Sequence, residues 1–152
     1  MKKKIRILIV DDHPVVRQGL MACLERHGDF SVVGEAGDGF EAVALCRERK
    51  PDLVLMDIAM PRMSGLAASE MLRKELPEVK VLILSMHASR EYVARVIQCG
   101  AAAYVLKDTS PENRWREIST RLAAAVFRMP CYFRVLISIC CKTFRTLLVR
   151  RM

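Results

Sequence analysis

Five side chains of this sequence could together handle a divalent cation and a phosphoryl group. They are three carboxylates, one hydroxyl and one ammonium group, and each stands at or just after an apolar run: Asp11, Asp12, Asp57, Ser85 and Lys107. Hard divalent cations prefer carboxylate oxygens, while hydroxyl and ammonium groups can donate hydrogen bonds to phosphoryl oxygens. If the apolar runs are neighbouring strands, their ends converge and the five side chains form one site.

Each of these residues also has a structural explanation when it is taken alone. Asp57 could cap a turn before Pro61. The adjacent acids Asp11 and Asp12 could form a solvated turn that holds no cation. A hydroxyl ends many strands, and a lysine such as Lys107 is usually a solvated charge. Five such positions in one chain favour a shared site over five separate coincidences.

The elements that must position these side chains follow from short apolar runs separated by helical patterns. The uninterrupted run 53–56 before Asp57 is typical of a strand that is buried on both faces. The predicted strands cover residues 5–10, 30–36, 53–57, 81–84 and 104–106. The first predicted helix begins near Pro14 and ends at Gly28. The next three cover residues 40–49, 66–76 and 89–99, and a fifth begins at Ser110.

Five strands that alternate with five helices predict an α/β fold, a doubly wound parallel sheet with helices on both faces. The inner face of the helix over residues 40–49 is expected to include Phe40, Val43 and Cys46 or their immediate neighbours. Because the strands are parallel, the functional edge of the sheet is the one at their carboxyl ends.

The composition predicts one domain and an unusual tail. The chain has 152 residues and a formal charge of +8. Residues 1–117 carry 18 basic and 17 acidic residues, whereas residues 118–152 carry 7 basic residues and no acid. The six cysteines lack metal-site spacing, and no signal peptide precedes the first strand, so a reducing cytoplasm is expected.

The site residues and their surroundings resemble the receiver domain of two-component response regulators. The matching features are the acid pair 11–12, Asp57 followed by Met60-Pro61 and Gly65, Ser85, and Tyr104 three residues before Lys107. The amino-acid sequences of segments 84–87 and 104–112 are most similar to those of LuxR-type (NarL/FixJ-like) regulators. The resemblance implies a flavodoxin-like strand order 2-1-3-4-5 and covers residues 5 to about 118.

The resemblance also implies a phosphoacceptor and a cofactor. Asp57 would accept a phosphoryl group from the phosphohistidine of a sensor histidine kinase, with self-phosphorylation and self-dephosphorylation as its only turnover. Asp12, Asp57 and the Ala59 backbone carbonyl would bind Mg²⁺ directly, and Asp11 would act largely through bound water. The protein would therefore be a phosphoacceptor and not an enzyme.

Four further residues complete the implied site and its switch. Lys107 and Ser85 would each contact a phosphoryl oxygen. When Ser85 moves, Tyr104 would turn inward and change the surface formed by the fourth helix, fifth strand and fifth helix. Met86 is bulkier than the small residue often found there in the family, and is expected to slow loss of the phosphoryl group.

The resemblance fades beyond residue 122, which divides the chain into a receiver (1–122) and a basic amphipathic tail (123–152), helical or disordered. The tail shows no recognisable helix-turn-helix and is too polar to span a membrane, so DNA binding is not expected without an output domain. It could lie on anionic lipid, pack against a partner or a second copy, or be a truncation or frame accident.

Two functional outcomes follow for the chain as a whole. It is expected to be a truncated transcriptional regulator, which is a receiver whose DNA-binding half is missing. The alternative is a stand-alone response regulator or phosphate sink that acts by protein contacts. A homodimer formed through the receiver is a further expected partner.

Overall fold

The computed structural model describes residues 4–26, 28–86 and 90–107. Within them, strands and helices alternate along the chain as the sequence predicts. The elements are β1 (Ile5–Val10), α1 (Pro14–Glu25), β2 (Phe30–Ala36), α2 (Gly39–Arg49), β3 (Leu53–Asp57), α3 (Gly65–Glu75), β4 (Lys80–Ser85), α4 (Arg90–Gln98) and β5 (Ala103–Leu106). The predicted fifth helix and the tail lie outside the described residues.

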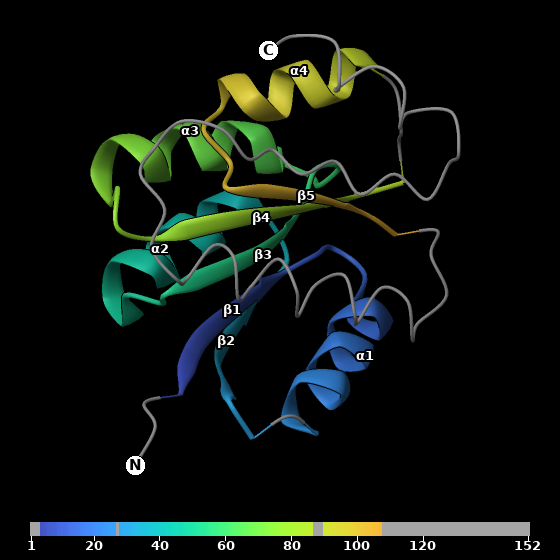
Figure 1. Cartoon of the computed structure of the whole chain (residues 1–152), viewed down its shortest axis with the longest axis vertical. Coiled ribbons are helices and arrows are strands. Elements are labelled where there is room, and N and C mark those ends of the chain that lie inside the picture. Colours follow the sequence, from blue (N-terminus) through green and yellow to red (C-terminus); the bar gives the residue numbers. More distant parts are fainter. Residues whose placement is uncertain (1–3, 27, 87–89, 108–152) are drawn as a thin grey trace, which may run out of the picture.

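The five strands form one parallel sheet in the order β2-β1-β3-β4-β5. Helix α1 lies on one side of this sheet, and α2, α3 and α4 lie on the other (Figure 1). The predicted α/β class, the strand order and the placement of helices on both faces are therefore confirmed.

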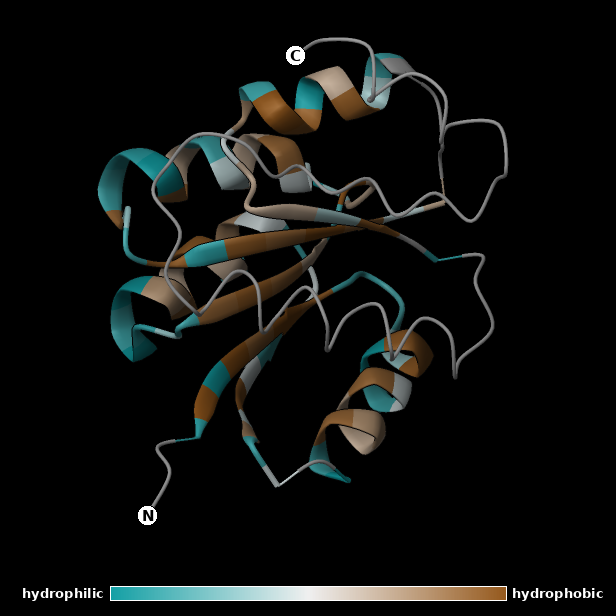
Figure 2. Cartoon of the chain, in the orientation of Figure 1, coloured by the Kyte–Doolittle hydropathy of each residue, from teal (hydrophilic) through white to brown (hydrophobic). Residues whose placement is uncertain are grey.

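The helices pack on the sheet through two apolar cores, one on each face. On one face, α2, α3 and α4 pack over residues such as Val54, Met56 and Ile83. On the other face, Leu20 and Leu24 of α1 belong to a cluster with alternate residues of the same strands. Figure 2 shows the central strands as mainly hydrophobic, with hydrophilic stretches on the helices. Because β3 is buried along its whole length, its last residue is delivered to the edge of the sheet from a rigid position.

Helix ends follow local sequence signals. Pro14 stands at the start of α1, where its missing N–H costs nothing. Asp38 and Ser64 cap α2 and α3 by accepting hydrogen bonds from the N–H groups of Glu41 and Ala67. These caps fix where the two helices begin, next to the loop that follows β3.

The inner face of α2 contains Val43 and Cys46 as predicted, and an immediate neighbour in place of Phe40. Phe40 is 55% exposed, whereas its neighbour Gly39 is buried together with Val43 and Cys46. A β-carbon on Gly39 would lie 2.6 Å from Met63 Cγ, so this glycine permits close contact with the loop after β3. That contact directs Phe40 outward.

The described cysteines follow the expectation that they are small apolar side chains. Cys46 and Cys99 are buried and Cys23 is partly exposed, and all three are free thiols. Burial raises the pKa of Cys46 to about 12, which keeps it in the unreactive thiol form.

Among the described residues, none of the helices has the length and apolar character needed to cross a membrane.

Candidate functional site

The register of the sheet brings the first two predicted site residues to the same edge. Val10 of β1 pairs with Met56 of β3 in the parallel ladder. The residues that follow them, Asp11 and Asp57, therefore leave neighbouring strands at the same level. This arrangement is a consequence of parallel pairing, because all strands end on one side.

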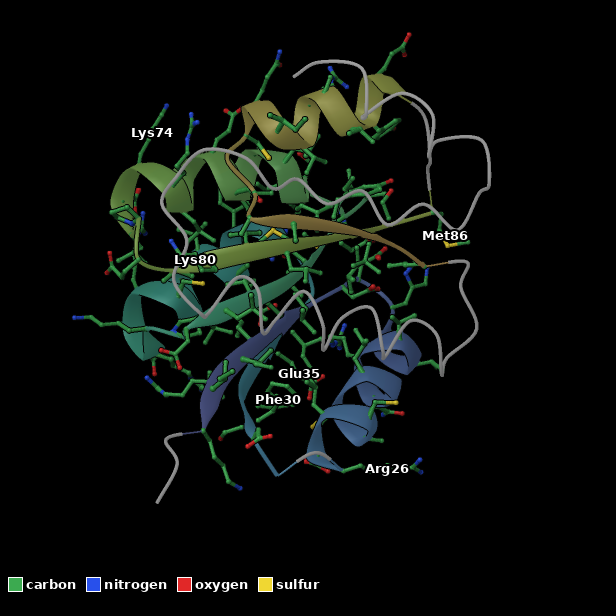
Figure 3. The ribbon with its side chains drawn as sticks, viewed as in Figure 1. Arg26, Phe30, Glu35, Lys74, Lys80 and Met86 are labelled. Atoms are coloured by element: carbon green, nitrogen blue, oxygen red, sulfur yellow. The ribbon has the colours of Figure 1, made fainter. Side chains whose placement is uncertain are left out.

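Ser85 and Lys107 reach this edge from the other half of the sheet. Ser85 pairs with Leu106, and the Lys107 N–H donates a hydrogen bond to the Ser85 carbonyl at 2.8 Å. In Figure 3, Lys80 marks the start of β4 and Met86 lies beyond its other end. The structure thus gathers residues that are as far apart as positions 11 and 107.

Lys107 contacts two buried carboxylates. Its Nζ lies 2.5 Å from Asp11 Oδ2 and 3.0 Å from Asp57 Oδ1. The side chains of Asp11, Asp57 and Lys107 are only 0%, 8% and 11% exposed. One ammonium group therefore bridges two like charges that solvent barely reaches, where electrostatic interactions are stronger than in water.

Asp57 is harder to ionise than an ordinary aspartate. Burial is the main cause of its raised pKa, and the negative charge of Asp11 adds to the effect. Lys107 and the Ile58 N–H act in the opposite direction, because both stabilise the carboxylate. A further positive charge at this edge would favour the ionised form of Asp57.

Asp12 and His13 extend the site toward solvent. The Asp12 side chain is 28% exposed, and its Oδ1 lies 2.7 Å from His13 Nδ1. The same imidazole nitrogen lies 3.3 Å from Asp11 Oδ1, and the His13 N–H donates to that oxygen at 2.9 Å. Sequence reasoning missed His13, although its position directly after the acid pair was a usable signal.

Arg17 is a second basic residue that sequence reasoning missed. Its Nη1 donates to the Asp11 carbonyl at 2.7 Å, and its Nε donates to Glu35 Oε2 at 3.0 Å. Arg17 follows His13 by one helical turn, and its N–H donates to the His13 carbonyl. The first turn of α1 therefore fixes the backbone of Asp11 against β2.

Ser85 and Tyr104 are both inside the protein. Ser85 is 1% exposed at the end of β4, next to the backbone of Lys107. Tyr104 is 3% exposed and belongs to the core that also contains Ile83 and Val96. The tyrosine ring is thus already in a buried arrangement in this structure.

The loop between β3 and α3 is attached to the strand that carries Asp57. Ala59 is exposed two residues after Asp57, while the neighbouring Ile58 carbonyl accepts the Gly65 N–H at 3.0 Å. This hydrogen bond closes the loop back onto the end of β3. The Ala59 carbonyl therefore lies in a loop whose two ends are fixed.

A second connection ties the same loop to α2. The buried Asp38 side chain accepts a hydrogen bond from the Glu41 N–H and forms an ion pair with Arg62. The capping hydrogen bond is the main cause of the lowered pKa of Asp38, and Arg62 lowers it further. Arg62 has a left-handed φ of 63°, and the Gly39 N–H donates to the Met63 carbonyl at 3.1 Å.

Comparison with known proteins decides the family. Residues 7–118 match the response regulator receiver domain. The chain belongs to the response regulator receiver family. Receivers of two-component systems act as phosphoacceptor regulators and not as classical enzymes, and they interact with histidine kinases.

Similar receivers occur in larger bacterial regulators. The chain is 45% identical to the transcriptional regulatory protein YxjL of Bacillus subtilis over 112 residues, which are 74% of this chain and 51% of that protein. It is 44% identical to the transcriptional regulatory protein MctR of Rhizobium johnstonii over 119 residues, 78% of this chain and 56% of that protein. The chain thus spans about half the length of these relatives.

Solved structures show the same fold. The receiver domain of the response regulator NarL from Mycobacterium tuberculosis is 34% identical, with a TM-score of 0.75, and the match covers 83% of this chain and 99% of that one. The response regulator domain of Thermotoga maritima CheB is 29% identical, with a TM-score of 0.77, and the match covers 84% and 100% of the two chains.

The acidic residues of this receiver fit the divalent cation that receivers generally bind. Among the described residues, Asp11, Asp12 and His13 each offer one ligand atom, and these atoms lie within 4.8 Å of one another. The two carboxylates supply the oxygen donors that Mg²⁺ prefers. The raised pKa of Asp57 is also consistent with a bound cation, because a positive charge beside Asp57 would favour ionisation of its carboxyl group.

Proposed function

We propose that Asp57 is the phosphoacceptor of this receiver and takes its phosphoryl group from the phosphohistidine of a sensor histidine kinase. The observation that supports this most strongly is the contact of the buried Asp57 carboxylate with Lys107, 3.0 Å away, beside Asp11. A nucleophile that is held next to a fixed cation suits phosphoryl transfer, because alignment and charge neutralisation provide most of the catalysis.

The reaction is a transfer between two protein side chains. An oxygen of Asp57 attacks phosphorus, the bond between phosphorus and the histidine nitrogen breaks, and its electron pair stays on the imidazole. The product is an aspartyl phosphate on Asp57. Asp12, Asp57 and the Ala59 carbonyl would hold Mg²⁺ directly, and Asp11 would act largely through bound water. When it is bound, the ion would neutralise charge on the phosphoryl oxygens.

Lys107 and Ser85 would bind the transferred group. Lys107 Nζ is close enough to Asp57 to pair with a phosphoryl oxygen there, and it is held in place by Asp11. The Ser85 hydroxyl would donate a hydrogen bond to another phosphoryl oxygen. Small donors would phosphorylate Asp57 by the same route, and water would later remove the group.

The proposed output is a change of the surface around α4 and β5. Movement of Ser85 toward the phosphoryl group would shift the end of β4 and with it the packing of Tyr104. Because Tyr104 is 3% exposed, the switch requires a second arrangement in which the ring is turned outward. Phosphorylation would shift the population between these two arrangements.

We also propose a role in transcription, as the receiver part (1–122) of a cytoplasmic regulator. The names of YxjL and MctR describe transcriptional regulatory proteins, which supports this role. A stand-alone regulator that acts by protein contacts, including a homodimer, is the second candidate. DNA retention that falls steeply with salt would favour the first, because binding to DNA phosphates releases counterions.

The phosphoacceptor proposal can be tested by mass measurement. Wild type that is incubated with Mg²⁺ and acetyl phosphate should gain the mass of one phosphoryl group, and Asp57→Asn should not. A chelator added before the phosphodonor should prevent the gain in wild type. Absence of an adduct on wild type would overturn the proposal, as would an unchanged adduct on Asp57→Asn.

A further inference from the structure

His13 folds back over the acid pair although it has room to point into solvent. Its side chain is 69% exposed, yet Nδ1 lies 2.7 Å from Asp12 Oδ1 and 3.3 Å from Asp11 Oδ1. The residue has an extended backbone with φ −93° and ψ 111°, followed by Pro14 at the start of α1. Its side chain makes no capping hydrogen bond to the helix, so the imidazole is available to the carboxylates.

The backbone holds this imidazole at a defined place. The N–H of His13 donates to Asp11 Oδ1 at 2.9 Å, and its carbonyl accepts the N–H groups of Val16 and Arg17. Pro14 restricts the backbone directly after it. The nitrogen is therefore presented to the acid pair by a fixed turn and not by a mobile loop.

The resulting donor set is not the one that Mg²⁺ prefers. Mg²⁺ takes oxygen ligands and keeps several waters, whereas imidazole nitrogen suits Zn²⁺, Ni²⁺ and related transition ions. Asp11, Asp12 and His13 offer two carboxylate oxygens and one nitrogen within 4.8 Å of one another. A simple ion pair between imidazole and acid would explain the contact equally well, but it predicts no selectivity among divalent ions.

We propose that His13 is a direct ligand of a divalent cation bound at Asp11 and Asp12, and that it increases the affinity of this receiver for imidazole-binding transition ions without helping Mg²⁺. The inference rests on the proposed function, because it uses the same acid pair. It adds a selectivity residue that the carboxylates alone do not supply.

Calorimetric titration of the full chain with Co²⁺ and separately with Mg²⁺ tests this directly. Removal of a metal-site partner commonly costs 10–100-fold in affinity, so His13→Ala should bind Co²⁺ at least about tenfold more weakly. Its affinity for Mg²⁺ should change by less than about twofold, because Mg²⁺ gains little from imidazole. His13→Asn, which keeps a residue that is favoured at helix starts, should behave like His13→Ala.

A second readout locates the bound ion beside His13. Bound Co²⁺ should broaden the imidazole NMR signals of His13 in wild type, and His27→Ala, which removes a histidine distant in sequence from the acids, should leave both affinities unchanged. The inference would be overturned if His13→Ala lost affinity equally for both ions, lost affinity for neither, or bound Mg²⁺ more tightly. Absence of Co²⁺ binding by wild type would also overturn it. Failure of the phosphoacceptor role would show separately, as absence of a phosphoryl adduct on wild type in Mg²⁺.

Discussion

A β-carbon on Gly65 would lie 1.9 Å from the carbonyl oxygen of Asp57, so the first turn of α3 rests directly against the backbone of the proposed phosphoacceptor. The Gly65 N–H also donates to the Ile58 carbonyl at 3.0 Å. Only a residue without a side chain permits this approach. The position of Asp57 at the edge of the sheet therefore depends on a residue eight positions later.

Gly65→Ala should move the end of β3 and damage the site. The new methyl group meets backbone atoms that cannot rotate away, and overpacking of this kind costs about 1–3 kcal/mol. We expect a lower free energy of unfolding by denaturant titration and at least tenfold slower phosphorylation by acetyl phosphate.

Gly19→Ala is the matched control for this substitution. Apart from its chain neighbours and the nearby backbone of α1, no atom lies within 4 Å of a β-carbon at Gly19, which is exposed within this helix. Alanine in a helix is favoured over glycine by about 0.5–1 kcal/mol, so this variant should be slightly more stable and fully phosphorylated. If both variants lost phosphorylation alike, the clash at Asp57 would not be the cause.

Lys107→Met should destabilise the fold and suppress phosphorylation. It leaves Asp11 and Asp57 buried without their shared cation, and loss of one partner from a buried ion pair costs about 3 kcal/mol. It also raises the pKa of Asp57, because Lys107 normally lowers it. The decline of phosphorylation toward acid should therefore begin at a higher pH than in wild type.

Lys80→Met provides the comparison for a lysine outside the site. Lys80 is exposed at the start of β4, at the opposite end of that strand from Ser85. Its loss should change stability by less than about 0.5 kcal/mol and leave the pH profile unchanged. Similar pH profiles for the Lys80 and Lys107 variants would contradict the role given to Lys107.

Asp57→Asn should stabilise the protein at neutral pH. Burial raises the folded-state pKa of Asp57 above its usual 3.8, so the folded chain holds this proton to a higher pH than the unfolded chain. The stability of wild type then falls as pH rises from 3.8 through the raised pKa. Asparagine carries no such proton, and Lys107 keeps Asp11 as its partner.

Denaturant titrations at several pH values would measure this linkage. The free energy of unfolding of Asp57→Asn should increasingly exceed that of wild type as pH rises from 3.8 through the raised pKa of Asp57. At higher pH the difference should remain constant. Well below pH 3.8 the difference in free energy of unfolding should be small, because the wild-type carboxyl is then neutral in both the folded and the unfolded state. An advantage that is independent of pH would show that charge burial is not its source.

Much of the fold could be predicted because its signals are local. The fully apolar run of β3 and the glycines and prolines between elements indicate where strands and helices lie. The shared position of Asp11, Asp57, Ser85 and Lys107 follows from parallel pairing alone. The distance of 2.5 Å between Lys107 and Asp11 does not, since it spans 96 positions and depends on a side-chain rotamer.

The contacts that sequence reasoning missed depend on loop conformation. Arg62 contacts Asp38 from a left-handed backbone conformation. That conformation could not be predicted, because position 62 is not a glycine. Phe40 fits the period of an inner helix face, but the close approach of Gly39 to Met63 turns it to solvent. Helical period fixes which residues share a face and leaves open which face touches the rest of the protein.

Two substitutions of Asp38 should separate its capping role from its ion pair. Asp38→Ala removes both, and loss of a cap costs about 1 kcal/mol. Asp38→Ser keeps an oxygen for the Glu41 N–H and loses only the partly exposed pair with Arg62, which is worth at most about 1 kcal/mol. Thermal unfolding should therefore place the serine variant between wild type and the alanine variant.

The same pair tests whether the loop after β3 is positioned by α2. Arg62 lies three residues after Ala59, so release of Arg62 should loosen the loop that carries the proposed carbonyl ligand. Both Asp38 variants should need more Mg²⁺ for half-maximal phosphorylation than wild type. Unchanged Mg²⁺ dependence in Asp38→Ala would restrict the role of Asp38 to stability.

Met86→Ala should shorten the lifetime of the phosphorylated protein. Met86 directly follows Ser85 at the edge of the sheet, and its side chain is 64% exposed (Figure 3). We expect this side chain to hinder the approach of water to a phosphoryl group on Asp57. Removal of this bulk should lower the barrier to hydrolysis, and a change of about 0.6 kcal/mol corresponds to about threefold faster decay. Met86→Leu, which keeps most of the bulk, should decay at the wild-type rate. Loss of the phosphoryl group can be followed by mass after removal of acetyl phosphate, and equal rates for wild type and the alanine variant would exclude a shielding role.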